Sequence, residues 1–349
     1  MGAKHFGARI TRLEDPVLLT GKGHYVDDIK LPGTLHACFV RSPHAHARIK
    51  SIDVTAAQAL PGGHAVYVAD DMPRRIATGQ IPMLVPNPTI KTPRTQIALA
   101  RDEVCYAGQT VAVAIADTRY LAEDAAAAVV VDYEMLPAAS DARDAVKEGA
   151  ARVHADLASN VAAFVPMAYG DVEAAFKNAQ HVFEEDIFLH RGGAMTLEGR
   201  AVLANYEPAG DTLTVWSATQ TPHLCRSTLA DLLERDLESI RVVAPFVGGG
   251  FGTKAPFYPE EAVIPAAAMK LGRPVRWQED RREHFLSSTQ ERDQYWKVAI
   301  AVDNDGKILG LRGAMLHDTG AYLPWGIIDR KSTRLNSSHI PLSRMPSSA

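Results

Sequence analysis

A glycine-rich segment is the part of this sequence whose residue types and spacing best suit chemistry. Residues 247–254 read Val-Gly-Gly-Gly-Phe-Gly-Thr-Lys and follow the β-branched run at residues 240–243. Glycines lack a Cβ, so the backbone can approach a ligand closely and point its amide N–H groups at it. A loop of this kind suits anions, phosphates or metal-oxo groups.

The glycine segment does not match the two common nucleotide-binding loops. A Walker loop needs a glycine directly before its Lys-Ser/Thr pair, whereas Lys254 follows Thr253. A Rossmann turn needs glycines at its first, third and sixth positions, and Thr253 and Lys254 interrupt that spacing. The segment therefore predicts a less common cofactor.

A second segment, Ser-Ala-Thr-Gln-Thr-Pro-His at residues 217–223, precedes the glycines and contains Gln220. Together the two segments closely resemble the molybdenum-binding subunit of the xanthine dehydrogenase, aldehyde oxidase and aerobic carbon monoxide dehydrogenase family. The resemblance continues in segments spread along the chain, at residues 19–29, 31–37, 39–49, 122–125, 132–134, 271–275 and 318–322. It covers nearly all of residues 8–328, and the combination is highly specific.

The resemblance implies a molybdenum-molybdopterin cofactor, in its cytosine dinucleotide form, with Gln220, Gly249, Gly250, Phe251 and Gly252 as the cofactor-binding residues. In the family these residues lie against the oxo ligand of the metal. We expect the Gln220 amide N–H₂ to be one donor to that oxygen and a backbone N–H at residues 251–252 to be the second. Phe251 would wall the site and exclude water. No direct metal ligand is expected in this chain.

The implied activity is that of a molybdenum-dependent oxidoreductase, which oxidises an aldehyde, an N-heterocycle or carbon monoxide with water as the oxygen source. Ala255 stands where purine-oxidising relatives carry a glutamate, which argues against xanthine or hypoxanthine as the substrate. Electrons would pass to a small [2Fe–2S] subunit and a medium FAD-binding subunit, in a dimer of heterotrimers. The alternative is a non-catalytic binding or assembly module with the hammerhead fold, in which the glycine loop is only structural.

Other polar residues have simpler interpretations. His44 and His46 share one face of a strand and mimic a metal pair, but without a third ligand nearby in sequence we expect structural histidines. Glu198 lies in a segment that leads toward the active site in relatives, and an ordinary ion pair with Arg200 is the competing interpretation. The charged run at residues 279–283 reads as a solvated face or a subunit contact.

Composition favours a cytoplasmic protein with sizeable hydrophobic cores. Hydrophobic residues make up 46% of the 349 residues, and the formal net charge of −4 argues against a nucleic-acid groove. Cys38, Cys105 and Cys225 are far apart and odd in number, which suits a reducing compartment. The sequence starts without an apolar leader and contains no stretch of about eighteen apolar residues. It therefore predicts neither export nor a membrane span.

Strand and helix patterns position these residues in a mixed α/β (α+β) fold. We predict strands at residues 35–41, 46–54, 64–69, 111–115, 129–133, 181–189, 213–217, 240–244, 295–302 and 308–316, and helices at 119–128, 172–179, from 222 onward, and 259–271. The predicted division is an N-terminal arm (1–19), an α/β hammerhead domain (20–135), a linker (136–160) and an incomplete first molybdopterin-binding domain (161–328).

The last segment, residues 329–349, has no helical or strand period and contains six serines. It reads as a translated sequencing adapter, so we expect a non-native tail and exclude it from the fold. On that interpretation the chain is an N-terminal fragment, and the family's catalytic glutamate lies beyond residue 328. No catalytic residue is therefore assigned, and we expect the fragment by itself to be inactive.

Overall fold

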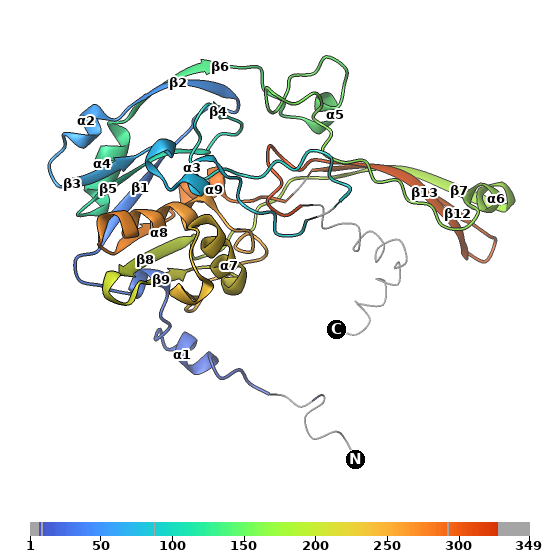
Figure 1. Ribbon diagram of the computed structural model, residues 1–349. Helices are drawn as coiled ribbons and strands as arrows, with labels where there is room; N and C mark the ends of the chain where they lie inside the picture. Colours follow the sequence, from blue (N-terminus) through green and yellow to red (C-terminus); the bar gives the residue numbers. More distant parts are fainter. Residues whose placement is uncertain (1–6, 8–9, 87, 292, 327–349) are drawn as a thin grey trace.

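One seven-stranded sheet runs through the body of the computed structural model, which describes residues 7, 10–86, 88–291 and 293–326 (Figure 1). The strand order is β10-β9-β8-β11-β1-β5-β3. These strands are β1 (Leu35–Arg41), β3 (Gly63–Tyr67), β5 (Thr110–Ala116), β8 (Ala201–Glu207), β9 (Thr212–Ser217), β10 (Ile240–Val243) and β11 (Val275–Gln278).

The sheet joins the two domains that the sequence predicts. β1 belongs to the first and β11 to the second, and they pair in parallel with Leu35 opposite Val275. The packing is continuous across this junction, because the Phe39 ring meets the Trp277 ring edge-on with centroids 5.6 Å apart. One large hydrophobic core therefore contains side chains from both regions.

Three helices that pack against this sheet follow the start signals in their sequences. α8 (Pro259–Leu271) begins with proline at its first position and with acids in its first turn, which matches the helix dipole. α7 (Pro222–Leu232) also begins with proline. In α4 (Arg119–Ala127), the side chain of Thr118 accepts a hydrogen bond of 3.2 Å from the Leu121 N–H. These caps confirm the predicted helix starts.

The remaining strands of the described residues form two smaller sheets. β4 (Glu103–Val104), β2 (Ala47–Asp53) and β6 (Val130–Met135) form one of them. β13 (Ile308–His317), β12 (Gln294–Val302) and β7 (His181–Leu189) form the other, which projects from the body as an arm (Figure 1). The predicted hairpin at residues 304–306 links β12 to β13, with Gly306 at a φ of 78°. β1 and β2 follow each other along the chain but lie in different sheets.

Short helices fill the connections: α1 (Asp15–Leu19), α2 (Thr55–Gln58), α3 (Arg74–Thr78), α5 (Ala142–Ala145), α6 (Val172–Asn178) and α9 (Arg281–Ser287), with 3₁₀ turns η1 (Val26–Asp28), η2 (Ala69–Asp71), η3 (Pro208–Gly210) and η4 (Leu237–Ser239). The mixed α/β fold class is thus confirmed. Within the described residues, no helix has the length and apolar character needed to cross a bilayer. The predicted non-native tail lies outside the described residues.

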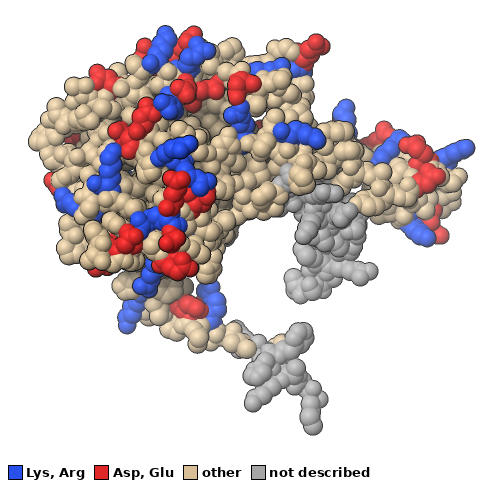
Figure 2. Space-filling model, viewed as in Figure 1, with Lys and Arg blue, Asp and Glu red and all other residues tan. Residues whose placement is uncertain are grey.

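The surface carries both signs of charge. On the face shown in Figure 2, Lys and Arg side chains are interspersed with Asp and Glu side chains over the body and along the arm.

Candidate functional site

The glycine loop connects β10 to α8 and turns sharply. Gly249, Phe251 and Gly252 have positive φ angles of 98°, 48° and 89°. A Cβ on Gly250 would lie 2.4 Å from Cδ of Gln220, and a Cβ on Gly248 would lie 2.5 Å from Cβ of Glu198. Two of the glycines are therefore needed for the close approach of protein side chains to the loop.

Gln220 lies against this loop and is fixed by it. Its main-chain N–H donates to the Lys254 carbonyl at 2.9 Å. Its side-chain Oε1 accepts hydrogen bonds from the N–H groups of Gly252 (3.0 Å) and Lys254 (3.3 Å). Only the amide oxygen can accept these two hydrogen bonds, so Oε1 faces the loop. The amide nitrogen, Nε2, then lies on the other side of the amide group, where it can donate to a ligand.

Glu198 holds the other end of the loop. Its Oε2 accepts a hydrogen bond from the Gly248 N–H at 2.7 Å and forms an ion pair with Nζ of Lys254 at 2.9 Å. Its main-chain N–H also donates to the Gly248 carbonyl at 3.1 Å. The competing interpretation, an ion pair of Glu198 with Arg200, is wrong, because Glu198 pairs with Lys254 while Arg200 pairs with Glu260 and Glu279.

Arg200 lies in a buried cluster of charges behind the loop. Its guanidinium pairs with Glu260 at 2.9 Å and with Glu279 at 2.6 Å, and it stacks 3.9 Å from the centre of the Tyr258 ring. Burial alone would raise the pKa of Glu279, but Arg200 and the hydrogen bonds that the carboxylate accepts hold it at about 2. The charge of Arg200 is thus compensated inside the protein.

The same cluster reaches β1 through Arg41. This side chain pairs with Glu260 at 2.7 Å and with Glu283 at 2.9 Å. The prediction that residues 279–283 form a solvated face is therefore wrong for the two glutamates of the run. The side chain of Glu279 has no exposed surface and that of Glu283 is 17% exposed, since both are turned inward to meet arginines.

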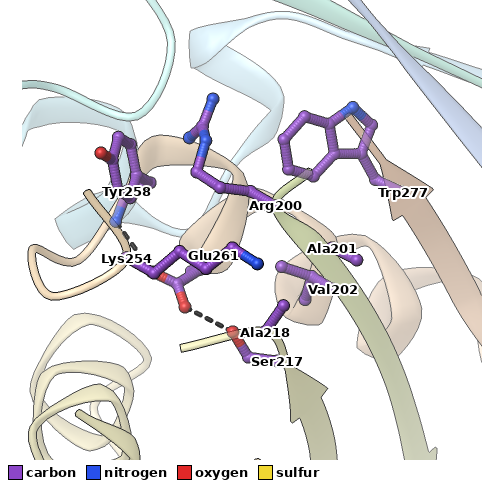
Figure 3. A pocket seen from close by; sticks show the side chains of 9 residues that line it. All are labelled: Arg200, Ala201, Val202, Ser217, Ala218, Lys254, Tyr258, Glu261 and Trp277. Atoms are coloured by element: carbon purple, nitrogen blue, oxygen red, sulfur yellow. Dashed lines mark hydrogen bonds between the residues drawn. The ribbon is translucent and has the colours of Figure 1, made fainter. Parts of the chain in front are cut away.

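A small cavity is lined by Lys254 and by residues at the end of β9 (Figure 3). Ser217 donates a hydrogen bond of 2.6 Å to Glu261, whose other carboxylate oxygen accepts from the Tyr258 N–H. Burial raises the pKa of Glu261. The cavity is lined by Arg200, Ala201, Val202, Ser217, Ala218, Lys254, Tyr258, Glu261 and Trp277. All nine lining residues are buried, and one of them, Lys254, ends the glycine loop.

The two histidines that mimic a metal pair do not converge. The His44 ring packs edge-on against Tyr133 at 4.9 Å. His46 turns to Glu103, with Nε2 2.7 Å from a carboxylate oxygen, and its Nδ1 lies 2.7 Å from the Pro137 carbonyl. The contacts of His44 fit its expected structural role, whereas His46 and Glu103 have a further neighbour, Cys105.

Comparison with known proteins decides the family. The model of the molybdopterin cofactor-binding domain matches residues 153–338, and that of the aldehyde oxidase and xanthine dehydrogenase a/b hammerhead domain matches residues 20–137. The chain belongs to this molybdopterin-binding family. The predicted resemblance is therefore confirmed.

Individual members of the family are similar along most of the chain. The nicotine 6-hydroxylase large subunit of Paenarthrobacter nicotinovorans is 38% identical over 90% of this chain and 38% of its own length. The carbon monoxide dehydrogenase large chain of Hydrogenophaga pseudoflava is 37% identical over 88% of this chain and 39% of its own. The chain thus spans about two fifths of the length of these relatives.

A solved structure supports the same fold. Quinoline 2-oxidoreductase from Pseudomonas putida 86 matches with a TM-score of 0.80 and 38% identity, over 88% of this chain and 38% of that chain.

The loop geometry fits the cofactor of the family in its donor chemistry. The Nε2 edge of Gln220 offers a fixed, neutral donor, which suits a ligand that only accepts hydrogen bonds. The structure changes one expectation, because the Gly252 N–H donates to Gln220 and so supports that side chain. The Phe251 ring, expected to wall the site, is 79% exposed in this chain.

Sequence reasoning missed the roles of Lys254 and Arg200. Lys254 was visible in the glycine motif, yet nothing local connects it with Glu198, 56 residues away. Likewise, Arg200 meets Glu260 and Glu279 at separations of 60 and 79 residues. One signal was available in the sequence: Lys254 and Arg200 each lie next to apolar residues, which indicates a buried charge that needs a partner.

Proposed function

We propose that this chain is the N-terminal part of the large subunit of a molybdenum hydroxylase. When bound, the molybdopterin cofactor supplies two-electron oxidation with water as the source of oxygen. The observation that carries the proposal is the fixed amide of Gln220 beside the glycine loop, within a chain of the molybdopterin-binding family.

Gln220, Gly249, Gly250, Phe251 and Gly252 are the residues that we assign to the cofactor. Gln220 Nε2 would donate to an acceptor ligand of the metal, and the loop backbone keeps the amide from rotating. Glu198 and Lys254 hold the two ends of the loop, which keeps its main chain in place. A donor fixed before the reaction needs no reorganisation during it, which is the main electrostatic advantage of a preorganised site.

The substrate class that we favour is an aromatic N-heterocycle. Two of the proteins similar to this chain are named for nicotine and quinoline, each at 38% identity. Ala255 leaves out the carboxylate that purine-oxidising relatives carry, so xanthine is disfavoured. An aldehyde or carbon monoxide is the remaining choice, and a carbon monoxide dehydrogenase large chain is 37% identical.

The proposed assembly follows the family. Electrons pass to a [2Fe–2S] small subunit and then to a FAD-binding medium subunit, in a cytoplasmic dimer of heterotrimers, and the pterin carries a cytosine dinucleotide. The three cysteines of this chain are free, and we assign the iron–sulfur centres to the small subunit because the family resemblance implies that subunit.

Gln220→Ala in the full-length subunit, produced with its partner subunits, tests this proposal. We expect turnover of an N-heterocycle to fall by roughly 5- to 150-fold, because the lost hydrogen bond to the cofactor would contribute about 1–3 kcal/mol. Molybdenum content and unfolding temperature are measured in parallel.

Gln180→Ala is the matched control, since its side chain is exposed and bonds only to the nearby Asn178 carbonyl. The control should keep full turnover. Unchanged turnover in Gln220→Ala, with molybdenum bound, would instead favour the non-catalytic module.

A further inference from the structure

Three side chains with metal-ligating atoms meet at the edge of the small β4–β2–β6 sheet, and His154 lies beside one of them. The ligating atoms of His46, Glu103 and Cys105 all lie within 4.8 Å of one another. Sγ of Cys105 is also 3.3 Å from Nδ1 of His154. His46, Cys105 and His154 are buried, and the Glu103 side chain is 24% exposed.

The outer nitrogens of both imidazoles are fixed by main-chain carbonyls. Nδ1 of His46 lies 2.7 Å from the Pro137 oxygen, and Nε2 of His154 lies 2.7 Å from the Ala321 oxygen. A carbonyl only accepts, so each outer nitrogen carries a hydrogen and donates it. The inner nitrogens, which face Glu103 and Cys105, are the ones that can offer a lone pair. Metal-bound histidines are oriented by the same kind of outer hydrogen bond.

Without a metal, the inner atoms share two protons. One lies between Nε2 of His46 and Oε1 of Glu103, which are 2.7 Å apart. The other is the thiol proton of Cys105, which is donated to Nδ1 of His154. If both protons leave, one carboxylate and one thiolate balance the charge of a single divalent cation.

We propose that His46, Glu103 and Cys105 bind a divalent metal of the zinc type, and that His154, which contacts Cys105, moves toward the metal as the fourth ligand. Thiolate and imidazole ligands favour zinc and exclude calcium and magnesium, which prefer oxygen. Tetrahedral bonds of about 2.0–2.3 Å place the ligand atoms roughly 3.3–3.7 Å apart. The Cys105–His154 pair, at 3.3 Å, already has this separation, and the His46–Glu103 pair would open from 2.7 Å. The other ligand atoms, up to 4.8 Å apart among His46, Glu103 and Cys105, would move closer together around the metal.

The metal would have a structural role. It would tie β2 and β4 to the segment around His154, whose outer hydrogen bond reaches Ala321 beyond β13. This site is separate from the proposed cofactor chemistry, and its test needs no activity of the enzyme.

Cobalt titration of the metal-stripped chain tests the proposal directly. We expect one Co²⁺ per chain, with the near-ultraviolet charge-transfer absorption of a thiolate–cobalt bond and with visible bands of a tetrahedral ion. Excess Zn²⁺ should remove both. Cys105→Ser should lose the charge-transfer band, whereas Cys38→Ser, which removes a thiol on β1, should keep it. His46→Gln should weaken binding at least about tenfold.

Absence of cobalt binding by the folded wild-type chain would overturn the proposal, as would a charge-transfer band that persists in Cys105→Ser. The wild-type titration decides the matter even if Cys105→Ser does not fold. Circular dichroism establishes that each protein tested is folded.

Discussion

Lys254 shows how one buried charge supports the candidate site. Its side chain has no exposed surface, and Glu198, its partner, is 12% exposed. Burial lowers the pKa of Lys254, while the hydrogen bond and charge of Glu198 act in the opposite direction. Glu198 in turn accepts from the Gly248 N–H. The ion pair therefore links the last residue of the loop to its first glycine.

Lys254→Met should lower the free energy of unfolding by about 3 kcal/mol, because it leaves the Glu198 carboxylate without its cation in a largely buried place. Urea denaturation of this chain measures the change. Lys307→Met, at an exposed turn position, should stay within about 0.5 kcal/mol of the wild type. Equal stability of Lys254→Met and Lys307→Met would show that the pair does not support the loop.

At the scale of elements, the loop between β10 and α8 depends on the space around Gly250. A Cβ there would meet Cδ, Oε1 and Cγ of Gln220 at 2.4, 2.5 and 2.7 Å. At Gly210 an added Cβ would only meet Oγ1 of Thr212 at 3.5 Å, which is ordinary contact.

Gly250→Ala should therefore destabilise the chain by about 1–3 kcal/mol, the usual cost of overpacking. Gly210→Ala should have a smaller effect. In a Gln220→Ala background all three clashing atoms are gone, so the cost of Gly250→Ala should fall clearly. The coupling is measured by thermal and urea unfolding of the wild type, Gly250→Ala, Gln220→Ala and the double variant. A cost that is the same in both backgrounds would contradict the described contact.

Local elements could be predicted from the sequence because their signals are local. The proline starts of α7 and α8, the Thr118 cap of α4 and the hairpin at residues 304–306 each depend on a few adjacent residues. The neighbourhood of Gln220 and the glycine loop came from the family resemblance, and the hydrogen bonds agree with it.

Pairings between distant residues could not be predicted in this way. β1 pairs with β11 across about 240 residues, and no local pattern specifies that neighbour. The partners of Glu198, Arg200 and Glu279 were missed for the same reason, since ion pairs depend on which elements the sheet brings together. Charge runs such as residues 279–283 look solvated until their buried partners are known.

At the scale of the whole molecule, the buried charges of Arg41, Arg200, Glu260 and Glu279 connect both regions and make stability depend on pH. The folded state holds the pKa of Glu279 at about 2, against 4.5 as the ordinary value. A depressed carboxyl pKa stabilises the folded state above the unfolded value, and this contribution is lost as the pH falls.

Between pH 4.5 and 2, Glu279 should therefore contribute a loss of about 3 kcal/mol in the free energy of unfolding. Glu279→Gln should show a shallower dependence on pH in this window. Glu134→Gln, which removes a half-exposed surface pair with Arg48, should keep the wild-type slope. Parallel slopes for wild type and Glu279→Gln, measured by urea denaturation at each pH, would refute this assignment.

The pairing of β1 with β11 has a consequence for cutting the chain. A break in the segment between residues 137 and 153 would leave β1 and β11 each with an unpaired backbone edge, and would split the side chains of the shared core between two pieces. We therefore expect neither piece to fold stably by itself. When the two pieces are mixed, we expect them to associate and to form the β1–β11 pairing again.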